Sequence, residues 1–100
     1  MSKVLITKGI NMLISPDEIH KSLANQGWEY SDKKIFKTFN FDHYLDGINF
    51  VNKIAELAEN SNHHPDITIR WCRIDVTIFS HDMGGVTTKC VNLATSIDLI

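Results

Sequence analysis

The chain has 100 residues, a length typical of one domain, so we expect a single domain over residues 1–100. The formal net charge is -2 and the 10 lysines and arginines are scattered, which argues against nucleic acid as a partner because DNA-binding domains usually carry a basic face. No apolar stretch approaches the roughly 20 residues that cross a bilayer, so we expect no membrane association.

The first predicted helix begins after Ser15. A serine can cap a helix, and Pro16 suits the first helical position because the amide that proline lacks would be unpaired there. Ile19 and Leu23 recur at the helical spacing i, i+4, which indicates one buried face. Gly27 is expected to end this segment.

A β-hairpin is predicted next. Residues 28–30 are interpreted as a short strand, residues 31–34 are turn-like, and residues 35–41 are rich in β-branched and aromatic side chains. These three segments together indicate two antiparallel strands.

A long helix is predicted from a cap at Asp42 to about Asn60. Its apolar residues form two adjoining stripes, which together are wide enough to cover a sheet. One stripe contains Tyr44, Ile48, Val51, Ala55 and Ala58, and the other contains Phe50, Ile54 and Leu57. Pro65 disfavours helical geometry at His64 and so fixes where the chain leaves this helix.

Two further strands are predicted between residues 67 and 78. The apolar residues occupy odd positions up to Trp71 and even positions from Ile74 onward. A slip of one residue would turn every side chain to the other face, so a tight turn or bulge is expected near Cys72 and Arg73.

The last helix is predicted to follow a loop at residues 81–85, with Thr87 as its cap. Its inward residues are expected to be Cys90, Leu93, Ala94 and Ile97. The order of elements is therefore helix, two strands, helix, two strands, helix. Strands that occur in separate pairs indicate an α+β domain, in which a four-stranded antiparallel sheet has three helices packed on one face.

Two features bear on the compartment. Residues 1–8 lack the long apolar segment and the small-residue cleavage site of a signal peptide. Cys72 and Cys90 form neither a disulfide framework nor a metal-binding pattern, and we interpret them as two buried thiols. Both observations favour a cytoplasmic protein.

Three of the five histidines are candidates for a functional site. His63 and His64 follow the long helix, and His81 follows the last strand. If the intervening strands form a hairpin, their outer ends meet and bring the three histidines to one end of the sheet. Glu59 precedes His63 by one helical turn, where it is placed to orient or polarise that ring.

Three interpretations of these histidines are open from the residues alone. They can be solvated or structural side chains, they can move protons near neutral pH, or they can bind zinc. His20 and His43 occupy polar helical positions, and for both the solvated interpretation is preferred.

The segment from Glu59 to Asp98 resembles the pterin-4a-carbinolamine dehydratase family, whose activity is that of a 4a-hydroxytetrahydrobiopterin dehydratase. The resemblance rests on a pattern at fixed spacing rather than on any single triplet, and it covers roughly residues 15–100. Its principal residues are Glu59, His63, His64, Pro65, Trp71, His81, Gly84, Gly85, Val86 and Thr87. Further matches lie at Gly27, Trp28, residues 35–41, Phe50, Val51, Ala55 and Glu56.

The resemblance implies the same fold and a hydro-lyase that converts 4a-hydroxytetrahydropterin into quinonoid dihydropterin and water during tetrahydrobiopterin recycling. It implies His63, His64 and His81 as catalytic residues, with His63 and His81 moving the protons. The implied substrate-binding residues are His64, Pro65, Trp71 and Glu59. No metal and no cofactor are implied. A homodimer or homotetramer is implied, together with a functional link to aromatic amino acid hydroxylases and a cytoplasmic, or also nuclear, location.

The chain departs from the family pattern at two positions. Cys90 stands where the family usually has an acid three residues after the capping threonine, and Trp71 stands where the family often has tyrosine. Loss of a Thr-x-x-acid pair removes a capping box, and it would weaken activity if the acid also serves the site.

Two other functions compete with the enzyme. Some animal members of the family bind a transcription factor and stabilise its dimer through a helix surface, which in this chain would be Tyr44, Ile48 and Val51. The same residues are equally interpretable as core or homo-oligomer contacts. A pterin-binding module without catalysis is the third hypothesis, and Cys90 is the feature that supports it.

Overall fold

The computed structural model describes residues 11–23 and 25–100. Residues 1–8, for which we expect no signal peptide, lie outside the described part of the chain. The described elements, in chain order, are α2 (Pro16–Leu23), β1 (Glu29–Ser31), β2 (Lys34–Asn40), α3 (Tyr44–Ser61), β3 (Asp66–Arg70), β4 (Arg73–Ile78) and α4 (Thr88–Asp98).

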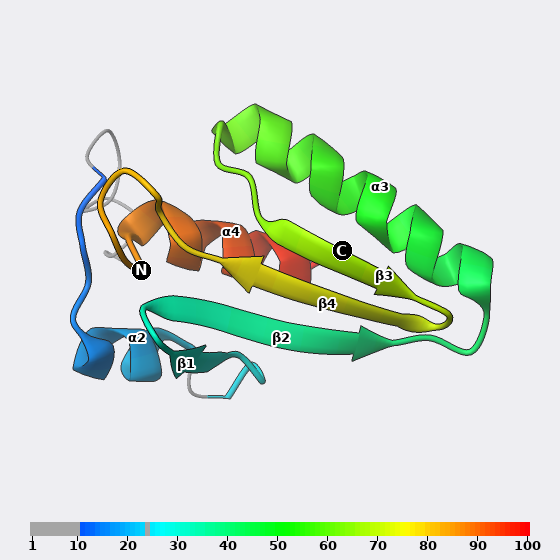
Figure 1. The fold of residues 1–100 in the computed structure, drawn as a ribbon, viewed down its shortest axis with the longest axis horizontal. Coiled ribbons are helices and arrows are strands. Elements are labelled where there is room, and N and C mark those ends of the chain that lie inside the picture. The colour runs from blue at the N-terminus through cyan, green and yellow to red at the C-terminus, as the bar shows by residue number, and fades with distance from the viewer. Residues whose placement is uncertain (1–10, 24) are drawn as a thin grey trace.

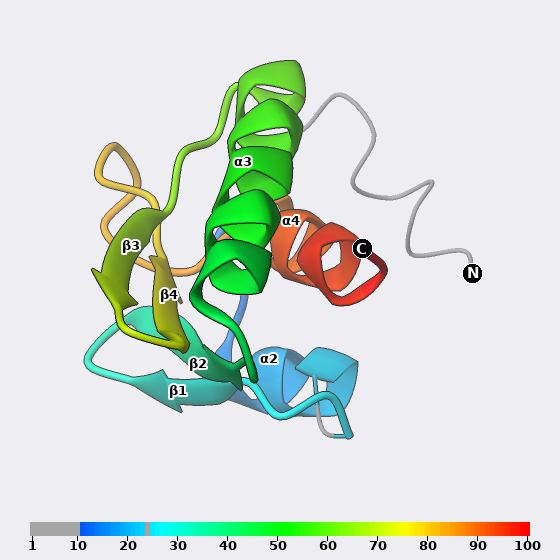
Figure 2. The same ribbon diagram turned by 90° about the vertical axis from the view of Figure 1, so that its right-hand side faces the viewer.

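The four described strands form one antiparallel sheet in the order β1-β2-β4-β3 (Figure 1). The three described helices lie on the same side of this sheet (Figure 2). Each hairpin joins two neighbouring strands of the sheet. β2 also pairs with β4, although α3 and β3 lie between them in the sequence. The predicted α+β fold, with its order of elements, is confirmed.

Helix α2 begins as predicted, because the Ser15 hydroxyl oxygen accepts a hydrogen bond from the N–H of Glu18 at 3.2 Å. The helix ends at Leu23, and Gly27, with φ of 82°, lies in the turn that enters β1 rather than at the helix end. The turn between β1 and β2 places Asp32 and Lys33 at positive φ. Two such residues in succession match the right-handed twist of a hairpin.

The prediction that Asp42 caps α3 is wrong, since His43 is the N-cap and makes no side-chain capping bond. The reason lies at the end of the preceding strand. The N–H of Phe41 is still bound to the carbonyl of Cys72 at 2.9 Å, so the chain leaves the sheet only after Phe41. Asp42 therefore belongs to the connection, and helical geometry begins at Tyr44.

The buried face of α3 is narrower than the predicted pair of stripes. Phe50, Ile54 and Ala58 are buried against the sheet, whereas Tyr44 is 48% exposed and Ala55 is exposed. The buried face of α3 therefore centres on the stripe that contains Phe50 and Ile54. The stripe that contains Tyr44 and Ala55 is only partly covered.

Strands β3 and β4 are joined by the two residues Trp71 and Cys72, and Cys72 has φ of 56°. This turn confirms the predicted break in the apolar alternation. Cys72 is half-buried, so the prediction of two buried thiols holds only for Cys90; both thiols are free.

The core lies between the sheet and the helices. From the sheet it contains Ile35, Ile74, Val76 and Ile78, and from α4 it contains Cys90, Leu93, Ala94 and Ile97. All four predicted inward positions of α4 are thus buried. In the described part of the chain, no helix combines the length and apolar character needed to cross a bilayer.

Candidate active site

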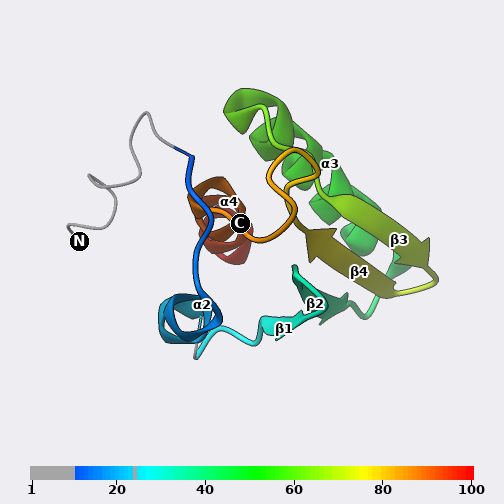
Figure 3. The ribbon, with the colours of Figure 1, turned by 60° about the vertical axis from the view of Figure 1, so that its left-hand side comes forward.

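Two connections carry the candidate histidines to the same end of the sheet. The β3–β4 register sets Asp66 opposite Thr77, so the chain entering β3 and the chain leaving β4 are neighbours. His63 and His64 lie on the first connection, and His81 lies on the second. Figure 3 shows the loop after β4 at the same end of the sheet as the connection from α3 to β3.

The end of α3 positions His63. Asn62 adopts left-handed backbone geometry, with φ of 52°, and ends the helix. The N–H of His63 then reaches back to the carbonyl of Ala58 at 3.1 Å, as in a helix C-terminal capping motif. This bond fixes where the His63 side chain leaves the backbone, and Pro65 follows directly before β3.

The His63 ring contacts a buried thiol that the sequence did not lead us to expect as its neighbour. Nε2 of His63 lies 3.1 Å from Sγ of Cys90, in the first turn of α4. The same sulfur lies 3.3 Å from Oγ1 of Thr87. Cys90 is fully buried, whereas His63 is half-buried. The residue that departs from the family pattern is therefore in direct contact with a candidate catalytic histidine.

Burial sets the protonation of this pair. It lowers the pKa of His63 below the ordinary value of 6.5, and the positive charge of Lys89 and the neighbouring His64 lower it further. Burial also raises the pKa of the Cys90 thiol, against hydrogen bonds from Thr87 and the backbone that lower it. The site therefore holds a neutral imidazole and a protonated thiol at neutral pH.

Glu59 contacts His64 rather than His63, which corrects the expected pairing. Oε2 of Glu59 lies 2.5 Å from Nε2 of His64, and both side chains are exposed. Glu59 lies within α3 while His64 is close to β3, so the contact spans the helix end. A carboxylate on one ring nitrogen fixes the orientation of that ring.

His81 is held in a compact loop. The N–H of Ser80 donates to the carbonyl of Gly85 at 2.8 Å, and the N–H of Gly84 donates to the carbonyl of Ser80 at 2.9 Å. The His81 ring packs on Phe79 with 4.3 Å between ring centroids, and it is exposed. An exposed imidazole on a closed loop is available to a ligand while its backbone is fixed.

The turn between β1 and β2 forms the other wall beside His81, which the sequence did not predict. Nζ of Lys34 lies 4.8 Å from the centroid of the Phe79 ring. A cavity of about 300 Å³ lies between this turn and the loop, and its lining residues are Asp32, Lys33, Lys34, Phe79, Ser80, His81 and Gly84. The pair of adjacent lysines was the only signal in the sequence for this basic wall.

Trp71 lies at the opposite end of the sheet, in the β3–β4 turn, and is 79% exposed. Within one chain it is therefore not brought together with the histidines. Pro65 lies directly before β3 and is half-buried at the histidine end.

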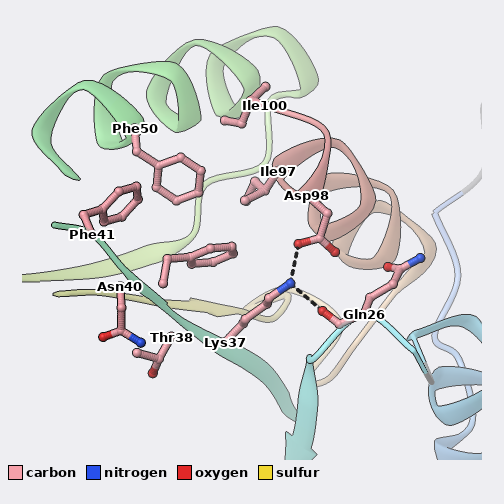
Figure 4. Close-up of a pocket in the computed structure, with 10 residues that line it drawn as sticks. Gln26, Lys37, Thr38, Asn40, Phe41, Phe50, Ile97, Asp98 and Ile100 are labelled. Atoms are coloured by element: carbon pink, nitrogen blue, oxygen red, sulfur yellow. Dashed lines mark hydrogen bonds and ion pairs between the residues drawn. The ribbon is translucent and has the colours of Figure 1, made fainter. Parts of the chain in front are cut away.

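A larger cavity, of about 540 Å³, lies between β2, α3 and the end of α4 (Figure 4). Figure 4 shows the amino group of Lys37 between the Asp98 carboxylate and the backbone carbonyl of Gln26. Aromatic side chains, including Phe41 and Phe50, form another wall. Because Lys37 and Asp98 neutralise each other, we place the candidate chemistry at the histidines despite the greater volume here. Asp98 is thereby committed to Lys37 and does not replace the acid missing at position 90.

The described residues contain no group of three His, Cys, Asp or Glu side chains arranged to hold a metal ion. His20 and His43 are exposed, in agreement with the solvated interpretation. His20 packs edge-on against Tyr30, with 6.2 Å between ring centroids.

Residues 12–100 match the family model described as Pterin 4 alpha carbinolamine dehydratase. A protein of Thermosynechococcus vestitus provisionally named as such a dehydratase is 42% identical over 82 residues, which cover 81% of this chain and 86% of that protein. A protein of Mycobacteroides abscessus with the same provisional name is 41% identical over 87 residues, which cover 86% and 93%.

Two solved structures share the fold. One is described as a transcriptional coactivator/pterin dehydratase from Brucella melitensis, with a TM-score of 0.82 and 28% identity over 87% of this chain and 96% of that chain. The other is a pterin dehydratase-like protein identified as a RuBisCO assembly factor in the α-carboxysome. Its TM-score is 0.59 at 22% identity, covering 72% of this chain and 83% of the other.

Proposed function

Because the chain belongs to the pterin-4-alpha-carbinolamine dehydratase family, we propose that it converts 4a-hydroxytetrahydropterin into quinonoid dihydropterin and water. In this proposal the protein serves tetrahydrobiopterin recycling, and its substrate comes from a pterin-dependent hydroxylase. The reaction removes the hydroxyl group from carbon 4a and a proton from the adjacent ring nitrogen.

The observation that carries the proposal is that two histidine-bearing connections leave the sheet at the same end. Dehydration needs one group that gives a proton to the departing hydroxyl and a second group that accepts the proton from nitrogen. His63 and His81 lie on different connections, which allows them to serve different atoms of a flat pterin ring. The lowered pKa of His63 keeps this ring neutral at physiological pH.

His64 and Glu59 are proposed to bind the substrate rather than to move its protons. Their contact at 2.5 Å orients the His64 ring at the same end of the sheet. Both side chains are exposed, so a ligand can reach them without opening the core. Pro65 supports this pair by fixing the entry into β3.

The direct test generates 4a-hydroxytetrahydropterin with a pterin-dependent hydroxylase and follows its loss by absorbance. Wild-type protein is expected to accelerate this loss, and the double variant His63→Ala, His81→Ala is expected to return it to the uncatalysed rate. The matched control is the double variant His20→Ala, His43→Ala, which removes two exposed histidines from other parts of the fold. Wild-type activity in the His63, His81 variant would refute the assignment.

A folded protein that binds pterin without accelerating the loss would instead support the binding module. Transcriptional coactivation is the remaining alternative. The similar structure from Brucella melitensis, described as a transcriptional coactivator/pterin dehydratase, gives a precedent for it. Its candidate surface is Tyr44, which is 48% exposed, with Ile48 and Val51, which are half-buried. In that case partner binding would survive the loss of both histidines.

We further propose that the working unit is a homodimer built on β3, which is an edge strand of the sheet. Two copies of β3 paired antiparallel about Thr68 would set Asp66 of each copy opposite Arg70 of the other. The two charges would then attract at both ends of the pairing. This arrangement would also bring Trp71 of a second copy beside Pro65. It would thereby supply the proposed substrate-binding aromatic side chain, which within one chain lies at the end of the sheet opposite to the histidines.

A further inference from the structure

The sulfur of Cys90 lies between two polar partners in an otherwise apolar surrounding. Nε2 of His63 is 3.1 Å away and Oγ1 of Thr87 is 3.3 Å away. The direction of these two hydrogen bonds decides which nitrogen of the His63 ring carries its proton, because a neutral imidazole has one donor and one acceptor.

The surroundings of the sulfur favour one direction. The Thr87 side chain is fully buried, and among the described residues its hydroxyl has Cys90 Sγ as its one hydrogen-bond partner, so its proton is satisfied only if the hydroxyl donates to the sulfur. A sulfur that accepts the Thr87 proton cannot at the same time donate its own S–H to that oxygen. The thiol's own S–H is then left for Nε2 of His63, which is the one ring nitrogen beside the sulfur in the described part of the chain.

We infer that Cys90 is a positioning residue that donates its thiol proton to Nε2 of His63 and thereby holds this ring in the tautomer with the proton on Nδ1. Among the described residues, none forms a hydrogen bond with Nδ1 of His63. Because the ring is half-buried with Nε2 turned to the sulfur, Nδ1 is the nitrogen left for a substrate.

This tautomer assigns a role to each histidine, and that assignment rests on the proposed dehydration. A ring that presents an N–H cannot take a proton from the pterin nitrogen. His63 therefore serves the departing hydroxyl as donor, and His81 takes the nitrogen proton. Neutral imidazoles are known to act as hydrogen-bond donors of this kind in other enzymes.

The proton balance closes within the site. As the bond from carbon 4a to oxygen breaks, the Nδ1 proton of His63 passes to the departing oxygen and forms water. Nε2 takes the thiol proton, which leaves a thiolate on Cys90 beside the hydroxyl of Thr87. The pterin nitrogen gives its proton to His81, and the carbon–nitrogen double bond forms. His81 then releases its proton to solvent, Nδ1 of His63 takes one up, and Nε2 returns its proton to the buried sulfur, which restores the thiol and the starting tautomer.

A carboxylate at position 90 would reverse this arrangement, because an ionised carboxylate only accepts hydrogen bonds. It would draw the His63 proton to Nε2 and favour the charged ring. The chain with cysteine and a variant with aspartate should therefore differ in tautomer and not merely in stability.

The test is a long-range ¹H–¹⁵N correlation spectrum of protein labelled with ¹⁵N-histidine, recorded at about pH 8, where the ring is neutral. The protonated and unprotonated nitrogens of a neutral imidazole have well-separated ¹⁵N shifts, and the signals of His63 are identified by their loss in His63→Gln. We expect the proton on Nδ1 in wild type. A proton on Nε2 of His63 in wild type would overturn the inference, whatever the activity.

Substitutions at position 90 distinguish the effect of the thiol proton on the His63 tautomer from a general effect of packing. Cys90→Ser keeps a donor and is expected to keep the proton on Nδ1, whereas Cys90→Ala and Cys90→Asp are expected to move it to Nε2. Cys72→Ser is the matched control, since it alters the other thiol at the far end of the sheet. An unchanged Nδ1 tautomer in a folded Cys90→Ala would also refute the inference. If the wild-type tautomer is as stated but no dehydration occurs, the proposed function fails and the positioning role stands.

Discussion

The indole N–H of Trp28 donates a hydrogen bond to Oδ2 of Asp98 at 2.9 Å, and so ties the start of β1 to the last residue of α4. Oδ1 of the same carboxylate lies 2.7 Å from Nζ of Lys37 on β2. One side chain thereby holds two strands and a helix together. Asp98 and Lys37 are only 16% and 22% exposed, so solvent screens their attraction less than at an open surface.

Asp98→Ala should therefore lower the free energy of unfolding by about 1–3 kcal/mol, because the buried Trp28 and the half-buried Lys37 lose their partner. Urea unfolding followed by tryptophan fluorescence measures this change. Arg73→Gln is the control, since it removes an exposed pair with Asp75 that should be worth at most about 1 kcal/mol. An effect of Asp98→Ala no larger than the control would contradict the structural role.

Single substitutions of the two catalytic histidines should each be costly. His63→Ala and His81→Ala are each expected to reduce the dehydration rate by about 10²–10⁴-fold, the usual contribution of a general acid or base. The exposed ring of His20 provides the control, and His20→Ala should leave the rate unchanged. Comparable losses in all three variants would indicate damage to the fold rather than to the site, which circular dichroism would reveal.

Acid should destabilise the protein partly through His63. The folded state lowers the pKa of this ring, so the unfolded state binds more protons once the pH drops below about 6.5. The stability from the neutral ring is fully present above the unfolded pKa and is lost as the pH falls toward the folded pKa. Besides Cys90, the groups that influence this ring are Lys89 and His64.

His63→Gln removes that titration. Urea unfolding at about pH 8 and about pH 5.5 should therefore show a smaller loss of stability in the variant than in wild type across this interval. Equal losses in the two proteins would mean that His63 titrates alike in the folded and unfolded states.

The core under α3 should be sensitive to truncation. Ile54 is fully buried between the helix and the sheet, so Ile54→Ala should lower the free energy of unfolding by about 2–5 kcal/mol. Leu45, on the same helix, is 67% exposed, and Leu45→Ala should change stability by no more than about 0.5 kcal/mol. Chemical denaturation of both variants tests whether one stripe carries the packing.

The proposed dimer on β3 predicts a charge-reversal result. Asp66→Lys or Arg70→Glu alone would set like charges opposite each other and should yield monomers, whereas the two changes together should restore the dimer. Light scattering coupled to size-exclusion chromatography measures the mass in solution. Dimers that persist in both single variants would place the interface elsewhere.

Much of the fold follows from local signals. The cap at Ser15, the shift of apolar phase between Trp71 and Ile74, and the inward residues of α4 all correspond to the structure. The start of α3 was misassigned because Phe41 is held by a bond to Cys72, a residue distant in sequence. A contact between residues so far apart in the sequence produces no periodic pattern of apolar residues from which it could be predicted.

The candidate site was less predictable for the same reason. The sequence predicts the end of the sheet at which the histidines lie, because the β3–β4 hairpin brings them there. It does not predict the side chains that contact the histidines, because these come from separate elements. Cys90 reaches His63 from α4, and Lys34 reaches the Phe79 ring beside His81 from the first hairpin. Glu59 was assigned to the wrong histidine because one helical turn of spacing does not include the left-handed bend at Asn62.

The two-residue turn at Trp71 and Cys72 also has a consequence for the order of folding. A hairpin with so short a loop forms within about 1–10 μs, because its contacts are local in sequence. Pairing β2 with β4 instead requires the chain to close around the whole of α3, which is entropically slower. The β3–β4 hairpin, which brings His63 and His81 to one end of the sheet, can therefore form before the sheet is complete. The relative placement of these two residues is then set early in folding, by contacts that are local in sequence.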